Sequence, residues 1–293
     1  MQVYPVIVTP KSLITALGIL FIPACMPRQT VVSASPPSPV QASRADVHSA
    51  ASTLSASQKQ KIGHKIWQNE SGNSVAGLTH WNEGEEFPSM GIGHFIWYPK
   101  GFQGRWTESF PLFIDYAGQR GSQGIPSWVL NSRHCPWPDK AAFQRDFNGS
   151  RLSSLRTWLT NNVALQTDYI IATSRQALPK IMNSAPHAQR SRIRANYQKV
   201  SSTAHGTYAL IDYVNFKGDG TNPTERYKAQ GWGLMWVLME MGDVPAGQAA
   251  ALEFAAAAKR CLDRRISNSP PARGEGRWKA GWHNRCNTYT RSL

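Results

Sequence analysis

The chain has 293 residues, is 41% hydrophobic and 10% aromatic with 11 tryptophans, and carries a formal net charge of +14. This apolar content excludes a wholly disordered chain and predicts a folded core. A strongly basic chain attracts polyanions. No nucleic-acid-binding motif accompanies the charge, so we expect no nucleic-acid partner. For an exported protein, the polyanions at hand are cell-wall polymers and anionic membrane surfaces.

Residues 1–25 have the pattern of an export signal. Lys11 precedes an apolar run from Leu13 to Ala24, which is too short to span a bilayer and is typical of a signal peptide. Ala24-Cys25 outlines a lipoprotein processing site at which Cys25 would be lipidated, although the two residues before Ala24 match this pattern imperfectly. We therefore expect an exported protein that is either periplasmic or anchored to the membrane as a lipoprotein.

Residues 26–57 are rich in Ser, Ala, Pro and Val without a helical or strand period, which predicts a disordered linker. The folded domain is expected over residues 58–293. Its first element is a helix from Ser57 to Glu70, with Ser57 as the N-cap and Gly72 as the stop signal. A loop from Asn73 to Pro88 follows.

A short strand-like stretch, Met90–Tyr98, comes next, and Gly91 and Gly93 interrupt it. Pro99–Pro138 is rich in Gly, Pro and aromatic residues, and we expect it to be irregular. Helical patterns dominate the rest of the chain, with predicted helices at 139–161, 163–178, 187–202, 204–217, 229–241, 245–267 and a short piece near 276–290. The predicted fold class is mainly α with a small β-hairpin (α+β).

The cysteines beyond Cys25 leave two alternatives open. Cys135, Cys261 and Cys286 cannot all pair, and no C-x-x-C spacing indicates zinc. A Cys261–Cys286 bridge is one alternative for an oxidising compartment, and three unpaired, mostly buried thiols are the other. The turn at 217–220 lacks the full spacing of a phosphate or calcium loop. We expect neither a metal nor a cofactor.

Glu70 is the first candidate catalytic residue. It follows Ile66 by four residues and Trp67 by three, so it projects from the apolar stripe of the first helix. Burial and the helix C-terminus both disfavour a carboxylate, which predicts a raised pKa. A protonated carboxylic acid is what acid-catalysed glycoside cleavage requires. The alternative is an exposed helix-end residue without a function.

The chain here resembles the lysozyme superfamily, most closely the phage-type muramidases. Glu70-Ser71-Gly72 resembles the position of their catalytic Glu, and Ser89-Met90-Gly91-Ile92-Gly93-His94 resembles their T-I-G-x-G-H hairpin. Ala209–Gly218 is similar to their later helix ending in F-N-x-G, and Gly281-Trp282-His283-Asn284-Arg285 to the G-L-x-x-R of their closing helix. The resemblance implies a lysozyme-like domain, here with an enlarged C-terminal helical lobe, that cleaves peptidoglycan glycan strands.

By this resemblance Glu70 is the general acid, and Ser89 offers a hydroxyl that positions a water or a second carboxylate. The glycines of the hairpin would let it pass close to the substrate. The family's second catalytic residue is usually an Asp before the hairpin, which this chain lacks, so Glu83, Glu85 and Glu86 compete for the role. We favour Glu86, because Phe87-Pro88 after it would pin the loop. Glu83, six residues before Ser89, is the runner-up.

Four residues are predicted to bind the substrate: Trp81, His94, Asp212 and Asn215. Sugar rings stack on indole faces, which suits Trp81. His94 would also anchor the hairpin through hydrogen bonds. For Asp212 the alternative is a buried carboxylate paired with Lys217 or an Arg.

Hydrolysis and single-Glu lytic transglycosylation both stay open as reactions. A chitosanase-like activity is less favoured, because a +14 protein repels a cationic polymer. The alternative from another class is a non-catalytic lipoprotein that binds the cell wall. The expected partners are peptidoglycan or another anionic wall polymer, and the membrane through a lipid anchor. The oligomeric state is left open.

Overall fold

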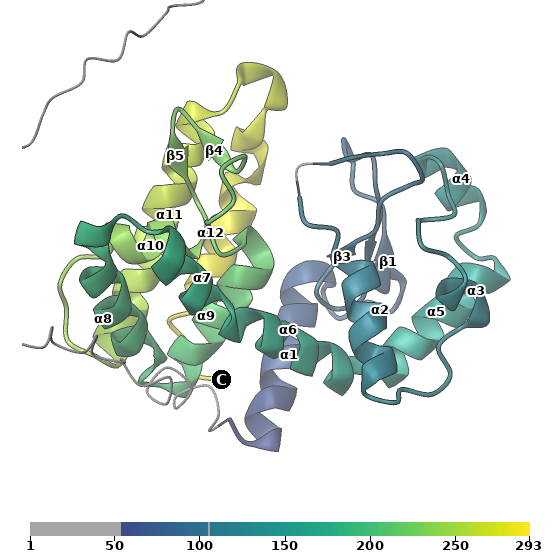
Figure 1. Ribbon diagram of the computed structural model, residues 1–293, viewed down its shortest axis with the longest axis horizontal. Coiled ribbons are helices and arrows are strands. Elements are labelled where there is room, and N and C mark those ends of the chain that lie inside the picture. The colour runs from purple at the N-terminus through teal and green to yellow at the C-terminus, as the bar shows by residue number, and fades with distance from the viewer. Residues whose placement is uncertain (1–53, 105) are drawn as a thin grey trace, which may run out of the picture. The chain divides into compact units, whose positions relative to one another are not determined.

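The computed structural model describes residues 54–104 and 106–293, which belong to the second of two compact units of the chain, Arg44–Leu293. This part is mainly helical with a small antiparallel sheet, as the sequence predicts (Figure 1). The predicted export signal with Cys25, and nearly all of the predicted linker, lie outside the described residues.

Helix α1 (Ala56–Ser71) carries Glu70 in its last turn. It begins earlier than predicted, because Ser55 rather than Ser57 is the N-cap. The Ser55 hydroxyl accepts from the Gln58 amide (3.1 Å), and the Gln58 side chain accepts from the Ser55 amide (2.8 Å). This reciprocal pair satisfies two amides that the helix leaves unpaired. Gly72, in the left-handed conformation (φ 62°), ends the helix at the predicted place.

A three-stranded antiparallel sheet follows α1, with strand order β1-β2-β3. The strands are β1 (Thr79–His80), β2 (Ser89–Met90) and β3 (Phe95–Ile96), preceded by the 3-10 turn η2 (Ala76–Leu78). His80 pairs with Ser89, and Met90 pairs with Phe95. The hairpin thus turns over residues 91–94, within the segment that resembles the muramidase motif.

The two hairpin glycines make room for protein neighbours. A Cβ atom on Gly91 (φ 75°) would lie 2.3 Å from the Gln166 side-chain oxygen, and one on Gly93 would lie 2.6 Å from the Phe95 ring. The Gln166 oxygen accepts a hydrogen bond from the Ile92 amide (2.9 Å). Packing against Gln166 and Phe95 therefore requires glycine at both positions, and the close approach of the hairpin to a substrate stays a prediction.

The region 99–138, predicted to be irregular, contains two helices, α2 (Phe110–Gln119) and α3 (Ser127–Leu130). The predicted helix 139–161 is two helices, α4 (Lys140–Arg145) and α5 (Ser150–Asn161). Asp139 caps α4 by accepting from the Ala142 amide (2.7 Å). The break falls at Gly149, where a Cβ atom would lie 1.8 Å from the Asp146 carboxylate.

The C-terminal half is helical except for one short hairpin of β4 (Arg226–Tyr227) and β5 (Gln230–Gly231), which the sequence did not indicate. Helix α9 has the predicted bounds. The remaining elements are α6 (Val163–Arg175), α7 (Ala177–Ser184), η3 (His187–Gln189), α8 (Arg190–Ser201), α9 (Ala204–Lys217), α10 (Leu234–Glu240), α11 (Gln248–Asn268), η4 (Pro271–Arg273), η5 (Glu275–Trp278) and α12 (Lys279–Thr288).

One hydrophobic core extends from α1 to α12 and includes residues of most of the helices and of β2 and β3. Helix α6 contacts both α1 and α9, and α11 packs against α10 and α12 (Figure 1). Gly63 permits the approach of α1 to α6, because a Cβ there would lie 2.1 Å from the Thr167 hydroxyl. The site residues of α1 and α9 are therefore held by tight packing.

The three cysteines in the described part, Cys135, Cys261 and Cys286, are free and buried. The Cys261–Cys286 bridge is therefore wrong, and the alternative of unpaired buried thiols is confirmed. Burial raises the pKa of each thiol to about 12. None of the helices that the structure describes is long and apolar enough to cross a membrane.

Candidate functional site around Glu70

The carboxylate of Glu70 lies where α1, the β2–β3 hairpin, α9 and α12 meet. Its side chain is 14% exposed. Ile66 and Ile62, one and two turns earlier on α1, are fully buried. Glu70 continues this apolar stripe, as its spacing predicts. The carboxylate is therefore drawn toward the core while part of it stays open to solvent.

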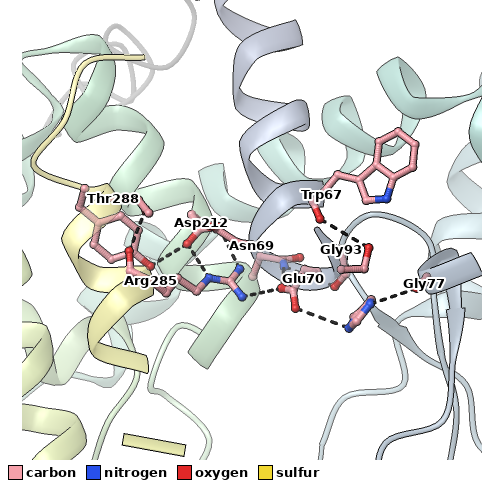
Figure 2. Close-up of polar contacts among 12 residues, drawn as sticks. Trp67, Asn69, Glu70, Gly77, Gly93, Asp212, Arg285 and Thr288 are labelled. Atoms are coloured by element: carbon pink, nitrogen blue, oxygen red, sulfur yellow. Dashed lines mark hydrogen bonds and ion pairs between the residues drawn. The ribbon is translucent and has the colours of Figure 1, made fainter. Parts of the chain in front are cut away.

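Arg285 of α12 joins Glu70 to a second, fully buried carboxylate. Its Nη1 lies 2.8 Å from Glu70 Oε1. Its Nε and Nη2 donate to the two oxygens of Asp212, at 2.8 and 2.9 Å (Figure 2). The Tyr289 hydroxyl also donates to Asp212 (2.7 Å), and the Phe216 ring lies 4.2 Å from the guanidinium. A bidentate pair of this kind fixes the plane of the guanidinium and aims its third nitrogen at Glu70.

The predicted substrate-binding role of Asp212 is thereby corrected. Asp212 is fully buried, so a ligand cannot reach it. The alternative, a buried carboxylate paired with an arginine, is the one that the structure confirms. Asp212 acts on the site by holding Arg285 in place.

The hairpin and α9 supply two further partners of Glu70. The Asn215 side-chain amide donates to Glu70 Oε1 (3.1 Å) and to the Gly93 carbonyl (3.3 Å). Nδ1 of His94 lies 3.5 Å from Glu70 Oε2, and Nε2 lies 3.2 Å from the Gly77 carbonyl. A carbonyl only accepts, so Nε2 carries the hydrogen. His94 anchors the hairpin as predicted, and its Nδ1 faces Glu70.

The charge state of Glu70 differs from the prediction. Burial by itself would raise the pKa of Glu70. The positive charge and hydrogen bond of Arg285, with His94 and Lys217 adding to them, lower the pKa below its ordinary value. The predicted upward shift is therefore wrong, because the sequence does not show that cations from two distant helices surround this carboxylate. Glu70 is ionised at neutral pH in the ligand-free site.

Lys217, at the end of α9, is a further cation of this site, which the sequence suggested only as a partner of Asp212. Its Nζ lies 3.8 Å from the centre of the Trp282 ring and 4.0 Å from that of Phe216. Burial lowers its pKa well below the ordinary value, and repulsion by Arg265 and Arg285 adds to the effect. The amine can therefore give up its proton more readily than an exposed lysine.

The three loop carboxylates have different environments. Glu83 is exposed and forms an ion pair with Lys140 of α4, and Glu86 is exposed. Glu85 is half-buried and accepts from the Asn82 side chain (2.9 Å). Burial raises the pKa of Glu85, while the Asn82 hydrogen bond and the charges of His94 and Lys217 partly oppose this.

Glu85 is thus the loop carboxylate whose pKa is affected by His94 and Lys217, the charges that also act on Glu70. The order that favoured Glu86 and then Glu83 is revised, because both of those side chains are exposed.

Two other predicted site residues lie in or near the core. Trp81 is buried, its indole packs edge-on against Phe143 (5.7 Å), and its Nε1 donates to the Glu85 carbonyl (2.7 Å). The prediction that Trp81 stacks on a sugar is therefore wrong; it holds the acidic loop. Ser89 is buried in β2, and its role in positioning a water stays a prediction. Among the described residues, no group of three or more His, Cys, Asp or Glu side chains is placed to hold a metal ion.

Comparisons of the chain with protein-family models, with curated proteins and with solved structures find no match.

Proposed function

We propose that this protein cleaves the glycan strands of peptidoglycan on a lysozyme-like domain, with Glu70 as the group that protonates the glycosidic oxygen. One observation carries the proposal. His94, Asn215 and Arg285 come from the three later segments that resemble muramidase motifs, and all three contact the carboxylate of Glu70. Two of these segments lie more than a hundred residues after Glu70 in the chain, and all three converge on the one residue that the first motif singled out.

A general acid must hold a proton, and Glu70 is ionised at rest. Bound substrate that excludes water disfavours the charged form of a carboxylate. Glu70 takes up a proton when such a strand also displaces the contacts of its carboxylate with Arg285 and Asn215. Glu70 then gives this proton to the glycosidic oxygen as the bond from that oxygen to the sugar C1 breaks.

Two routes complete the reaction. In hydrolysis a water adds its hydroxide to C1 and gives its proton to a carboxylate, for which Glu85 is the best placed of the loop residues. In transglycosylation a hydroxyl of the substrate attacks C1, and its proton returns to Glu70. Hydrolysis leaves a reducing sugar end, whereas transglycosylation leaves an anhydro-sugar end.

A second candidate function has an observation in its favour. Both oxygens of Glu70 are occupied by protein groups, Oε1 by Asn215 and Arg285 and Oε2 by His94. A carboxylate so fully engaged also suits a purely structural role. The protein would then be a non-catalytic cell-wall-binding lipoprotein, for which the basic surface supplies the affinity.

The deciding experiment is incubation of the protein with purified peptidoglycan and mass spectrometry of the soluble products. Products that disappear in Glu70→Gln support the enzyme, and the type of sugar end identifies the route. Glu240→Gln is the matched control, since Glu240 of α10 also pairs with arginines, Arg260 and Arg264. The absence of products, together with sedimentation of the protein with peptidoglycan, would establish the binding function instead.

A further inference from the structure

A groove of about 390 Å³ lies between α1 and α12, next to the Glu70 site. This volume is within the usual range of small-molecule sites, about 300–1,000 Å³. The fully buried Tyr208 of α9 lines it. The Tyr208 hydroxyl accepts from the Asn69 side chain (2.8 Å) and shares a hydrogen bond with the Thr288 hydroxyl (3.0 Å). The wall of the groove is thus built from packed and hydrogen-bonded side chains.

The groove carries positive charge without matching carboxylates. Its lining, among the residues that the structure describes, includes Lys65, Arg285 and Arg291 but no acidic residue. The charge of Arg285 is balanced by Glu70 and Asp212, whereas Lys65 and Arg291 form no ion pair with an acidic side chain in the part of the chain that the structure describes.

The environment of Lys65 shows the effect of this excess charge. Its Nζ donates to the Ser292 carbonyl (3.1 Å) and lies 5.6 Å from the centre of the Tyr208 ring. Burial lowers the pKa of Lys65, and repulsion by Arg291 and Lys61 lowers it further. An anionic group in the groove would relieve this repulsion.

Neutral polar groups line the rest of the groove. The side chains of Gln68 and Asn284 are exposed there, and amides both donate and accept hydrogen bonds. Such groups match the hydroxyl and acetamido substituents of a sugar, whereas the two cations match a carboxylate. Arg285 lines the groove and also contacts Glu70, so the groove and the Glu70 site share one side chain.

We propose that this groove binds an acidic sugar unit of the glycan strand, with its carboxylate toward Lys65 and Arg291 and its neutral substituents on Gln68 and Asn284. The choice of substrate class rests on the proposed function. The groove would hold the strand beside Glu70 and select strands that carry carboxylates. It would serve in the same way in a protein that binds the wall without cleaving it.

The test is a titration of the ¹⁵N-labelled protein with N-acetylmuramic acid and, separately, with N-acetylglucosamine, which lacks the carboxylate. We expect the acidic sugar to shift the amide resonances of residues 65–69 and 281–291. We also expect it to bind at least about fivefold more tightly than the neutral sugar at low ionic strength, the effect of one or two exposed ion pairs. Equal affinities, or shifts confined to other residues, would overturn the proposal.

Variants sharpen the test. Lys65→Gln/Arg291→Gln should weaken binding of the acidic sugar about fivefold or more, whereas the control Lys180→Gln/Arg151→Gln, with the same change of charge on exposed residues of α7 and α5, should not. Gly281→Met should block both sugars without removing any charge, because a Cβ atom there meets nothing within 4 Å. Equal losses of affinity for the acidic sugar in the two double variants would show a general charge effect and refute the proposal that the groove binds it.

Inorganic phosphate is the third ligand. If phosphate shifts the same resonances and binds as tightly as the acidic sugar, the groove is an anion site without sugar recognition and the proposal fails. These readouts do not depend on turnover. Cleavage of peptidoglycan without binding in the groove would overturn only the proposed role of the groove. Binding in the groove without cleavage would overturn only the proposed enzymatic function.

Discussion

Replacing Arg285 by methionine should destabilise the protein by about 3–5 kcal/mol, the usual cost of removing one partner from a buried ion pair. Arg285 supplies three charged contacts of 2.8–2.9 Å, two to Asp212 and one to Glu70. Methionine keeps most of the apolar volume but leaves the fully buried Asp212 with only its weaker partners, Tyr289 and Asn69. The uncompensated buried carboxylate, rather than lost packing, causes the loss.

The free energy of unfolding is measured by urea denaturation followed by circular dichroism. The control is Arg260→Met, because Arg260 is 45% exposed where it pairs with Glu240 and Glu253, and such pairs contribute about 0–1 kcal/mol. The double variant Arg285→Met/Asp212→Leu should recover most of the loss, since it removes both charges. A loss no larger than that of the control, or no recovery in the double variant, would refute this reasoning.

Three further predictions concern other carboxylates. Glu70→Gln should lower the rate of peptidoglycan cleavage about 10²–10⁴-fold, measured by mass spectrometry of released products; a rate near wild type would refute the acid assignment. If the reaction is hydrolysis, Glu85→Gln should lose far more activity in the same assay than Glu83→Gln or Glu86→Gln, and equal mild losses would favour transglycosylation. Burial would raise the pKa of Glu275, but the hydrogen bonds and charge of Arg265 lower it to about 2, so its stabilising contribution is complete above its ordinary pKa and is lost as the pH falls toward about 2. The free energy of unfolding, measured with urea, should therefore fall less between pH 5 and 2 in Glu275→Gln than in the wild type. The same dependence on pH in both proteins would contradict this.

The elements that the sequence predicted well have strong local signals. Helix α9 has the predicted bounds because Thr203 caps its start, accepting from the Gly206 amide (3.1 Å), and Gly218 ends it. The missed helix α2 also had a usable signal, since Phe110, Phe113 and Ala117 are buried at helical spacing and a proline stands in its first turn. The Gly- and Pro-rich surroundings concealed it.

The β4–β5 hairpin had no usable signal. Its turn residues, Lys228 and Ala229, adopt left-handed conformations (φ 48° and 62°). Glycine and asparagine are the residues that normally reveal such a turn. A lysine and an alanine give no such indication of a turn in the sequence. The packing around the hairpin must offset the strain of their left-handed conformations.

The candidate site was predictable only in part, for a different reason. Glu70, His94 and Asn215 were selected from the sequence, and the structure brings all three together. Arg285 lies in the segment that resembles the closing helix, but no local feature of the sequence marks it as a partner of Glu70, whose pKa it lowers. The effect of Arg285 on Glu70 depends on a contact between residues that are 215 positions apart in the chain. Periodicity and capping carry no information about such a contact.

The partners of Glu70 favour its carboxylate form. Arg285 and Asn215 each donate a hydrogen to it, and the charge of Arg285 opposes the upward shift of the pKa that burial alone would cause. The bidentate pair with Asp212 holds Arg285 in the position where it acts on Glu70. If Glu70 is the general acid, as proposed, a bound strand has to weaken the ion pair with Arg285 before Glu70 can hold a proton. The acid assignment therefore requires substrate to act on Arg285 as well as on Glu70.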